Sequence, residues 1–282
     1  MFVRRTFIFA VSLIAISCAV SNPNTKTTTP LANAAATSTP ATPTVSTVNI
    51  RSADGLVLGG IFLPAAQPNS PALLLLHQWQ SDRHSYDDFA KRMQAKGFNV
   101  LAVDGRGFGE STKSTDGKTV QAERTAAAVQ SMLSDVDAAM KFLADQPNVD
   151  RSKIGIVGAS YGSSLALIYA ADHPNIASVA LLSPGLNYFG NMPTEPAIKK
   201  YGDRPMFLVA AEDDKESADA VNKLLSAGNN TGYGANIYPS GGHGTALFKL
   251  KFPGDLEYRE LGNLLESFFT TRMGTPRAER RP

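Results

Sequence analysis

The sequence predicts an α/β domain: a mostly parallel sheet of about eight strands, covered by helices on both faces, with an antiparallel edge at its start. Strand-like apolar runs alternate with helical patterns along most of the chain. One run, Leu73–Leu76, is continuously apolar, as expected for a strand buried on both faces of a parallel sheet. The run Gly158–Gly162 (Gly-Ala-Ser-Tyr-Gly) lies between a predicted strand and a predicted helix.

The first half of the domain begins with a predicted hairpin. Asp54-Gly55 is a favoured turn pair between two alternating segments. Ser85, with Asp88 three residues later, indicates a helix start, and Gly97 indicates its end. The predicted strands of this half cover 45–51, 56–63, 71–77 and 98–104.

The second half continues the alternation. Apolar residues at helical spacing predict a long helix over 121–145, which stops before Pro147. A second helix follows Gly158–Gly162 over 163–171, and a last one lies near the C-terminus around Leu261 and Phe268. Loops at the carboxyl ends of parallel strands carry ligand sites, so we expect the site on that edge. The predicted strands cover 153–157, 178–183, 205–211 and 235–238.

Composition excludes some partners. The 282 residues suit one α/β domain with additions, and 27 basic against 25 acidic residues give a net charge of +2. This balance does not indicate a nucleic-acid surface. The single cysteine, Cys18, excludes an intramolecular disulfide.

The N-terminus has the pattern of an export signal: Arg4 and Arg5 precede the apolar run Phe7–Ile16. The run Ala15–Cys18 resembles a bacterial lipobox, which implies lipidation at Cys18 and export to the cell envelope as a membrane-anchored lipoprotein. An ordinary cleaved signal peptide and an uncleaved anchor remain alternatives.

Four segments follow from these patterns. We expect residues 1–18 to form the leader and residues 19–44, rich in Thr, Pro and Ala, to form a disordered tether because they cannot bury enough apolar surface. The α/β domain spans 45–272, and residues 273–282 form an Arg-rich tail.

The run Gly158–Gly162 has the pattern Gly-X-Ser-X-Gly of a nucleophile elbow, where a strand turns sharply into a helix and presents a serine hydroxyl. Glycines allow the tight bend because they have no Cβ. The N-terminus of the following helix favours negative charge that develops beside the serine. We therefore expect Ser160 to be the nucleophile of a serine hydrolase.

A serine hydroxyl needs a base, usually an imidazole, and the chain has four histidines. His173 lies at the end of the helix after the elbow, and His84 lies in a polar loop. His77 ends a strand beside the elbow but precedes the nucleophile in the chain. His243, within the run Ser240–Gly244, alone fits the hydrolase order of Ser, acid and His.

The acid that orients His243 should follow the strand at 205–211, where the loop offers Glu212, Asp213 and Asp214. We expect Asp214, with Asp213 as the alternative, because a few residues are needed to reach across from the strand end.

An oxyanion hole needs two backbone donors. The N–H of Tyr161, directly after the nucleophile, is the first. We expect the N–H of Trp79 to be the second, with Gln78 as the alternative. The Trp79 side chain either lines an acyl pocket or serves packing.

Residues 45–271 resemble the α/β-hydrolase superfamily, and within it dienelactone-hydrolase-type and small bacterial serine carboxylesterases. The resemblance implies the α/β-hydrolase fold and a structural role for Arg106. A dienelactone hydrolase usually carries a cysteine where this chain has Ser160, which argues against that activity. Residues 186–204 are enough only for a small cap. The matching runs are Leu74–Trp79, Asp104–Ser111, Gly158–Gly162, Ala211–Asp214 and Gly242–Gly244.

The sequence thus predicts a serine esterase that cleaves carboxylic esters of a small-molecule or acylated substrate through an acyl-enzyme. We expect no organic cofactor and no metal, because the histidines lack ligand spacing. A peptidase or an acyltransferase would use the same three residues, and a non-catalytic binding lipoprotein on the same fold is a third alternative.

Overall fold

The computed structural model of the chain describes residues 44–228 and 232–274. The leader with Cys18, nearly all of the expected tether and the arginines of the C-terminal tail lie outside these residues. In the described part, no helix is both long enough and apolar enough to cross a membrane.

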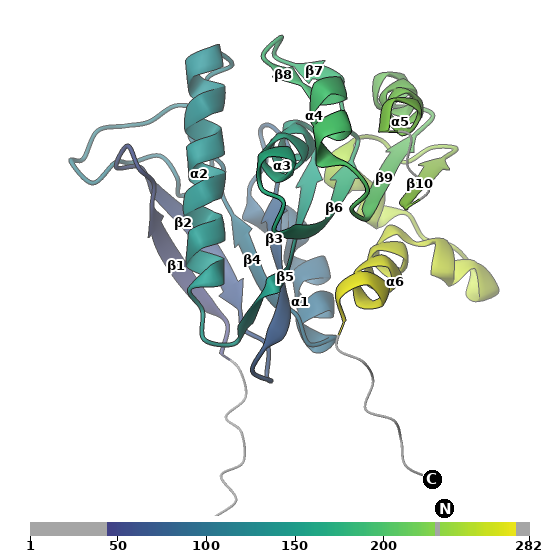
Figure 1. The fold of residues 1–282 in the computed structure, drawn as a ribbon, viewed down its shortest axis with the longest axis horizontal. Helices are drawn as coiled ribbons and strands as arrows, with labels where there is room; N and C mark the ends of the chain where they lie inside the picture. Colours follow the sequence, from purple (N-terminus) through teal and green to yellow (C-terminus); the bar gives the residue numbers. More distant parts are fainter. Residues whose placement is uncertain (1–43, 229–231, 275–282) are drawn as a thin grey trace, which may run out of the picture. The chain divides into compact units, whose positions relative to one another are not determined.

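An eight-stranded sheet forms the centre of the domain, in the order β1-β2-β4-β3-β5-β6-β9-β10 (Figure 1). β1 pairs antiparallel with β2, and β2 antiparallel with β4; the remaining pairs are parallel. The antiparallel edge and the parallel remainder agree with the sequence prediction. The strands are β1 (Ser46–Arg51), β2 (Val57–Leu63), β3 (Ser70–Leu76), β4 (Asn99–Val103), β5 (Val149–Ala159), β6 (Ile176–Leu182), β9 (Met206–Ala211) and β10 (Tyr233–Tyr238).

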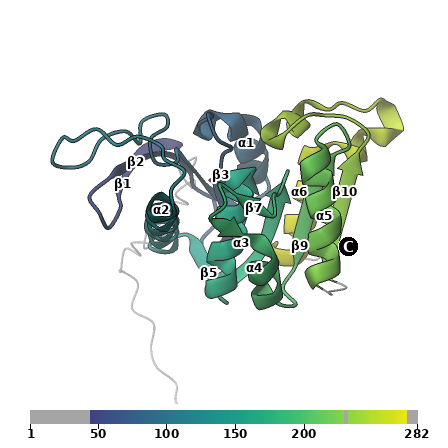
Figure 2. The same cartoon turned by 90° about the horizontal axis from the view of Figure 1, so that it is seen from above.

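Helices cover both faces of the sheet (Figures 1 and 2). Alternate residues of each central strand point to opposite faces, so Leu74 and Ile156 join one core and Leu73 and Val157 the other. The first core includes α2 (Ala126–Ala144), α3 (Tyr161–Asp172), α4 (Thr194–Tyr201) and α5 (Lys215–Gly228). The second includes α1 (Asp87–Ala95) and α6 (Leu261–Met273).

Two helix starts differ from the sequence prediction. Ser85 does not cap α1; a 3-10 turn, η1 (Arg83–Tyr86), comes first, and Asp82 caps it by accepting the N–H of His84 at 2.9 Å. α2 begins at Ala126 rather than near 121, because the Thr125 hydroxyl caps it and the preceding residues form an irregular loop.

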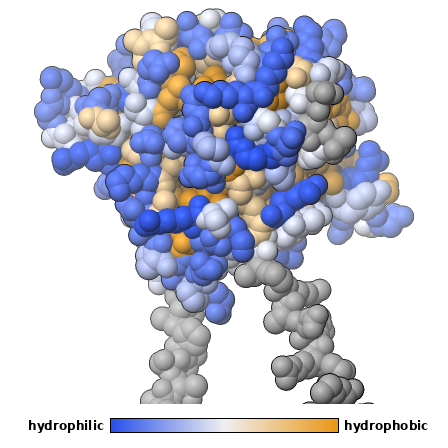
Figure 3. Space-filling model, in the orientation of Figure 1, coloured by the Kyte–Doolittle hydropathy of each residue, from blue (hydrophilic) through white to orange (hydrophobic). Residues whose placement is uncertain are grey.

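The region between β6 and β9 carries only a small addition to the sheet. It contains a two-stranded hairpin, β7 (Asn187–Tyr188) and β8 (Met192–Pro193), followed by α4. The small cap expected from the length of this segment is therefore what the fold contains. The face seen in Figure 3 is largely hydrophilic, with small apolar patches between polar side chains.

Candidate active site

Ser160 lies at the turn between β5 and α3, at the carboxyl edge of the parallel strands. Its backbone is in the left-handed region, with φ 54° and ψ −124°, as a sharp strand-to-helix turn requires. A Cβ on Gly158 would lie 2.1 Å from the carbonyl oxygen of Gly162. A Cβ on Gly162 would lie 2.7 Å from the carbonyl oxygens of Leu76 and His77. The two glycines therefore permit both the bend and the approach of the segment after β3.

His243 and Asp214 come from loops after adjacent strands. Asp214 follows β9 and His243 follows β10, and Nδ1 of His243 lies 2.7 Å from Oδ2 of Asp214. A carboxylate can only accept, so the imidazole proton is on Nδ1 and Nε2 is left to accept a proton. Burial raises the pKa of Asp214, but hydrogen bonding, led by His243, outweighs burial and holds it below its usual range.

The His243 loop is close to the elbow. A Cβ on Gly244 would lie 3.5 Å from the Cβ of Ala159, so the neighbours of His243 and Ser160 nearly touch. The N–H of Gly244 donates to the Ser183 hydroxyl at 2.8 Å, and the N–H of Ser160 donates to the Leu182 carbonyl at 2.8 Å. The end of β6 thus holds both segments.

Asp213 has different partners from Asp214. Its carboxylate accepts the N–H groups of Gly241 and Gly242, both at 3.1 Å. It therefore anchors the glycine-rich loop and leaves the imidazole of His243 to Asp214.

The other three histidines have structural partners. His77 is buried; its Nε2 accepts the N–H of Gly105 at 2.7 Å, and its Nδ1 lies 2.7 Å from the Gln78 carbonyl. Burial lowers the pKa of His77, which keeps the ring neutral. Nδ1 of His173 lies 2.7 Å from the Tyr169 carbonyl at the end of α3, and His84 is exposed beside Asp87. Neither nitrogen of His77 is available to a nucleophile.

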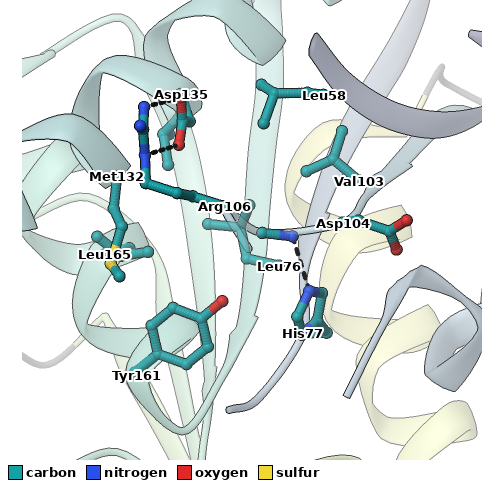
Figure 4. Close-up of a pocket in the computed structure, with 12 residues that line it drawn as sticks. Leu58, Leu76, His77, Val103, Asp104, Arg106, Met132, Asp135, Tyr161 and Leu165 are labelled. Atoms are coloured by element: carbon teal, nitrogen blue, oxygen red, sulfur yellow. Dashed lines mark hydrogen bonds and ion pairs between the residues drawn. The ribbon is translucent and has the colours of Figure 1, made fainter. Parts of the chain in front are cut away.

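Charged residues of the run Asp104–Ser111 brace the loop after β4. Asp104 is fully buried and pairs with Arg83. Arg106 makes two hydrogen bonds to the Asp135 carboxylate, at 2.8 and 2.9 Å, and a third to Asp54 at 2.7 Å. Figure 4 shows the Arg106–Asp135 pair among the residues that line a pocket, with His77 and Tyr161. The volume of this cavity is about 20 Å³. The structural role expected for Arg106 agrees with these contacts.

The two residues expected to supply oxyanion donors have neighbouring side chains. Tyr161 is the first residue of α3, so its N–H has no acceptor within the helix. Trp79 follows β3, and its ring lies 5.5 Å from the Tyr161 ring, between centroids. The Trp79 ring also contacts Phe108 and Phe189, each at 4.9 Å, and so forms an aromatic wall beside the elbow.

Gln78, the alternative donor, has an unexpected side-chain role. Its Oε1 accepts both the N–H and the hydroxyl of Thr245, at 2.7 and 2.8 Å. It thereby ties the loop after β3 to the loop that carries His243.

The sequence analysis missed Ser183 and Tyr188. Ser183 is fully buried with φ 47°, and the Tyr188 hydroxyl donates to its carbonyl at 3.0 Å. Ser183 directly follows β6, so its position at a strand end was the one signal available for it, whereas Tyr188 lies in β7. Within residues 44–228 and 232–274, no group of three or more His, Cys, Asp or Glu side chains could hold a metal ion.

The model of one protein family, described as "Serine aminopeptidase, S33", matches residues 67–211, which is just over half of the chain. The match includes Ser160 and ends before Asp214 and His243. It therefore covers the region from the segment before β3 through β9.

Curated relatives match part of the chain. An uncharacterized Mycobacterium tuberculosis protein, Rv2307c, is 30% identical over 138 residues, which are 49% of this chain and 44% of that protein. The polyketide transferase GrgF of a Penicillium species is 26% identical over 180 residues, 60% of this chain and 58% of that protein. The chain thus spans about half the length of the curated relatives it matches.

Solved structures share the fold. The Pyrococcus furiosus esterase Pf2001 superposes with a TM-score of 0.64 and 17% identity over 82% of this chain and 92% of that one. A dienelactone hydrolase from Anabaena variabilis superposes with a TM-score of 0.61 and 16% identity, over 82% of this chain and 99% of that one. These likenesses confirm the predicted α/β-hydrolase fold.

Proposed function

Since the chain belongs to the serine aminopeptidase S33 family of α/β hydrolases, we propose that it is a serine esterase that cleaves carboxylic esters through an acyl-enzyme. The observation that carries the proposal is the pairing of His243 with Asp214 at 2.7 Å, in a loop that contacts the elbow of Ser160.

Ser160 attacks the ester carbonyl while Nε2 of His243 takes the hydroxyl proton. Asp214 keeps the other imidazole proton on Nδ1 and stabilises the imidazolium that forms. The N–H groups of Tyr161 and Trp79 stabilise the oxyanion. The protonated imidazole then gives its proton to the leaving alcohol, and water, activated by the same base, releases the acid.

The substrate we propose is a small-molecule or acylated ester whose apolar part lies against Trp79, Phe108 and Phe189. Aromatic rings present wide apolar surfaces that accept acyl chains or rings without a specific polar partner. The small addition between β6 and β9 leaves room for substrates that a large cap would exclude.

Active-site labelling with a fluorophosphonate tests the nucleophile. The full chain should be labelled, and Ser160→Ala should lose both labelling and ester turnover, the latter by ~10⁶-fold. Ser164→Ala is the matched control, because Ser164 is a buried serine of α3 whose hydroxyl has no hydrogen-bond partner among the described residues. A folded wild-type chain that is not labelled would contradict the proposal and favour the binding-protein alternative.

The alternatives to ester hydrolysis are acyl transfer, thioester hydrolysis and peptide cleavage by the same three residues. The relative GrgF is described as a polyketide transferase, and the family as an aminopeptidase. A panel of matched acyl esters, acyl thioesters and aminoacyl anilides, each assayed in water and with an added alcohol or amine acceptor, separates these reactions. The esterase proposal expects the largest kcat/KM for the esters; a preference for thioesters or anilides would replace it.

We further propose that the chain is exported and anchored to the cell envelope through a lipid on Cys18. The lipobox-like run Ala15–Cys18 supports this proposal. Fractionation of a bacterial host expressing wild type and Cys18→Ser tests it. Wild type should remain in the membrane fraction and incorporate labelled fatty acid, and the variant should do neither. Equal membrane retention without fatty-acid label would favour an uncleaved anchor.

A further inference from the structure

The carboxyl end of β6 contacts the segments of all three proposed catalytic residues. Leu182, the last residue of the strand, accepts the N–H of Ser160 through its carbonyl at 2.8 Å. The next residue, Ser183, accepts the N–H of Gly244 through its hydroxyl at 2.8 Å. Gly244 directly follows His243, so two consecutive residues hold the nucleophile and the loop of the base.

Ser183 is also tied to the strand that precedes the acid. Its N–H donates to the carbonyl of Val209 in β9 at 2.7 Å, and Asp214 lies three residues beyond the end of that strand. The Tyr188 hydroxyl donates to the Ser183 carbonyl at 3.0 Å. All polar groups of Ser183 are therefore engaged at a position with no exposed surface.

The backbone of Ser183 is in a region that residues with a Cβ seldom adopt, with φ 47°. Such conformations persist where surrounding contacts over-determine them. At Ser183 those contacts are the hydrogen bonds to Val209, Gly244 and Tyr188.

The oxygen of the Ser183 hydroxyl accepts the N–H of Gly244, and the hydroxyl also has one proton that it can donate. The Ser183 hydroxyl also contributes to the lowered pKa of Asp214, after the larger effects of burial, of His243 and of Ser217. The Ser183 hydroxyl therefore binds the loop of the base and lies near the acid.

We propose that Ser183 is a positioning residue for the Asp214–His243 pair: its hydroxyl accepts the N–H of Gly244 beside His243, and its own N–H binds β9, the strand that precedes Asp214, so it fixes the loop of the base against the segment of the acid. This inference rests on the proposed serine-esterase function. A misplacement of about 1 Å in a reacting group costs about 100-fold in rate, so a lost anchor at this point should lower kcat more than substrate binding.

The test compares Ser183→Ala and Ser183→Gly in the full chain. Alanine removes the hydroxyl and keeps the strained φ, whereas glycine removes the hydroxyl and relieves the strain. We expect both to lose about 10- to 100-fold in kcat at unchanged KM, and the same factor in the rate of fluorophosphonate labelling. Ser178→Ala is the matched control: it removes another fully buried hydroxyl, one that lies within β6 and contacts Met273 rather than the site, and it should keep wild-type kcat.

A spectroscopic measurement reports the pair directly. The His243 Nδ1 proton, held by Asp214, should give a downfield proton NMR signal in wild type and Ser178→Ala. In Ser183→Ala and Ser183→Gly this signal should shift or weaken, because the imidazole is no longer held at one distance from the carboxylate.

The outcomes are separable. If Ser183→Ala unfolds, Ser183→Gly, which has no strained φ, decides the result. A folded Ser183 variant with wild-type kcat and an unchanged His243 signal would overturn the positioning role while the esterase proposal stands. Absence of labelling and turnover in wild type would instead overturn the esterase proposal and the positioning role with it.

Discussion

Asp213 and Asp214 are adjacent acids with separate partners. Asp214 faces the His243 imidazole, whereas Asp213 accepts two backbone N–H groups of Gly241 and Gly242. An acid that orients the base must remain ionised, because its charge stabilises the imidazolium formed during attack. The pKa of Asp214 is lowered because its hydrogen bonds outweigh the effect of burial, and a lowered pKa favours the ionised carboxylate.

We predict that Asp214→Asn lowers kcat by about 10⁴-fold, because an amide can donate to Nδ1 and so stabilise the wrong imidazole tautomer. Asp213→Asn is the matched control, since an amide oxygen can still accept the N–H groups of Gly241 and Gly242. Steady-state hydrolysis of one ester by both variants is the measurement. Equal losses in the two variants would count against Asp214 as the orienting acid.

The turn between β5 and α3 depends on two glycines for different reasons. Gly158 leaves space for the carbonyl of Gly162 within the turn itself, whereas Gly162 leaves space for the chain that follows β3. The second approach brings the end of β3 and His77 beside the elbow. The turn therefore brings three segments together: β5, α3 and the chain at the end of β3.

We predict that Gly158→Ala destabilises the domain and abolishes fluorophosphonate labelling. Its Cβ would lie 2.1 Å from a backbone oxygen, and relief of such overpacking costs at least about 1–3 kcal/mol. Gly262→Ala in α6 is the control, because its Cβ would meet only the Arg92 side chain at 3.5 Å. Alanine is also the better helix former by about 1 kcal/mol. Urea unfolding checks both; a Gly158→Ala variant as stable as wild type would show that the turn has room to adjust.

Across the whole domain, one arginine joins three parts of the chain. Arg106, in the loop after β4, pairs with Asp135 of α2 and with Asp54 at the turn of the β1–β2 hairpin. Its guanidinium is bidentate toward Asp135, and both side chains are 8% exposed, whereas Asp54 is 47% exposed. Arg106 therefore ties the loop after β4 to α2 through a buried ion pair, and to the β1–β2 hairpin through a partly exposed one.

We predict that Asp135→Asn lowers the free energy of unfolding by about 3–5 kcal/mol, because it leaves a buried guanidinium without its main partner. Asp54→Asn removes the exposed partner of the same arginine and should cost about 1 kcal/mol or less. Chemical denaturation of the two variants measures the difference. A similar, small loss in both would mean that water replaces Asp135 beside Arg106.

Much of the fold could be predicted because its signals are local. Leu73–Leu76 predicted a buried parallel strand, and the Asp54-Gly55 turn predicted the antiparallel edge. Helix starts were less accurate: the true caps are Asp82 and Thr125. A capping residue is distinguished from other polar residues nearby only by its backbone angles. A sequence pattern does not specify those angles.

The chain alone determined the kind of chemistry to look for: the Gly-X-Ser-X-Gly run, the order of Ser160, an acid and His243, and a sheet whose loops converge on one edge. The spacing of apolar residues predicts the helices and strands, because neighbouring residues determine it. The order of the motifs along the chain predicts the order of the site residues. The separate partners of Asp213 and Asp214, the tie of Gln78 to Thr245 and the position of Ser183 required the folded molecule. Each joins segments 28 to 167 residues apart, and such contacts exist only after the strands have packed side by side.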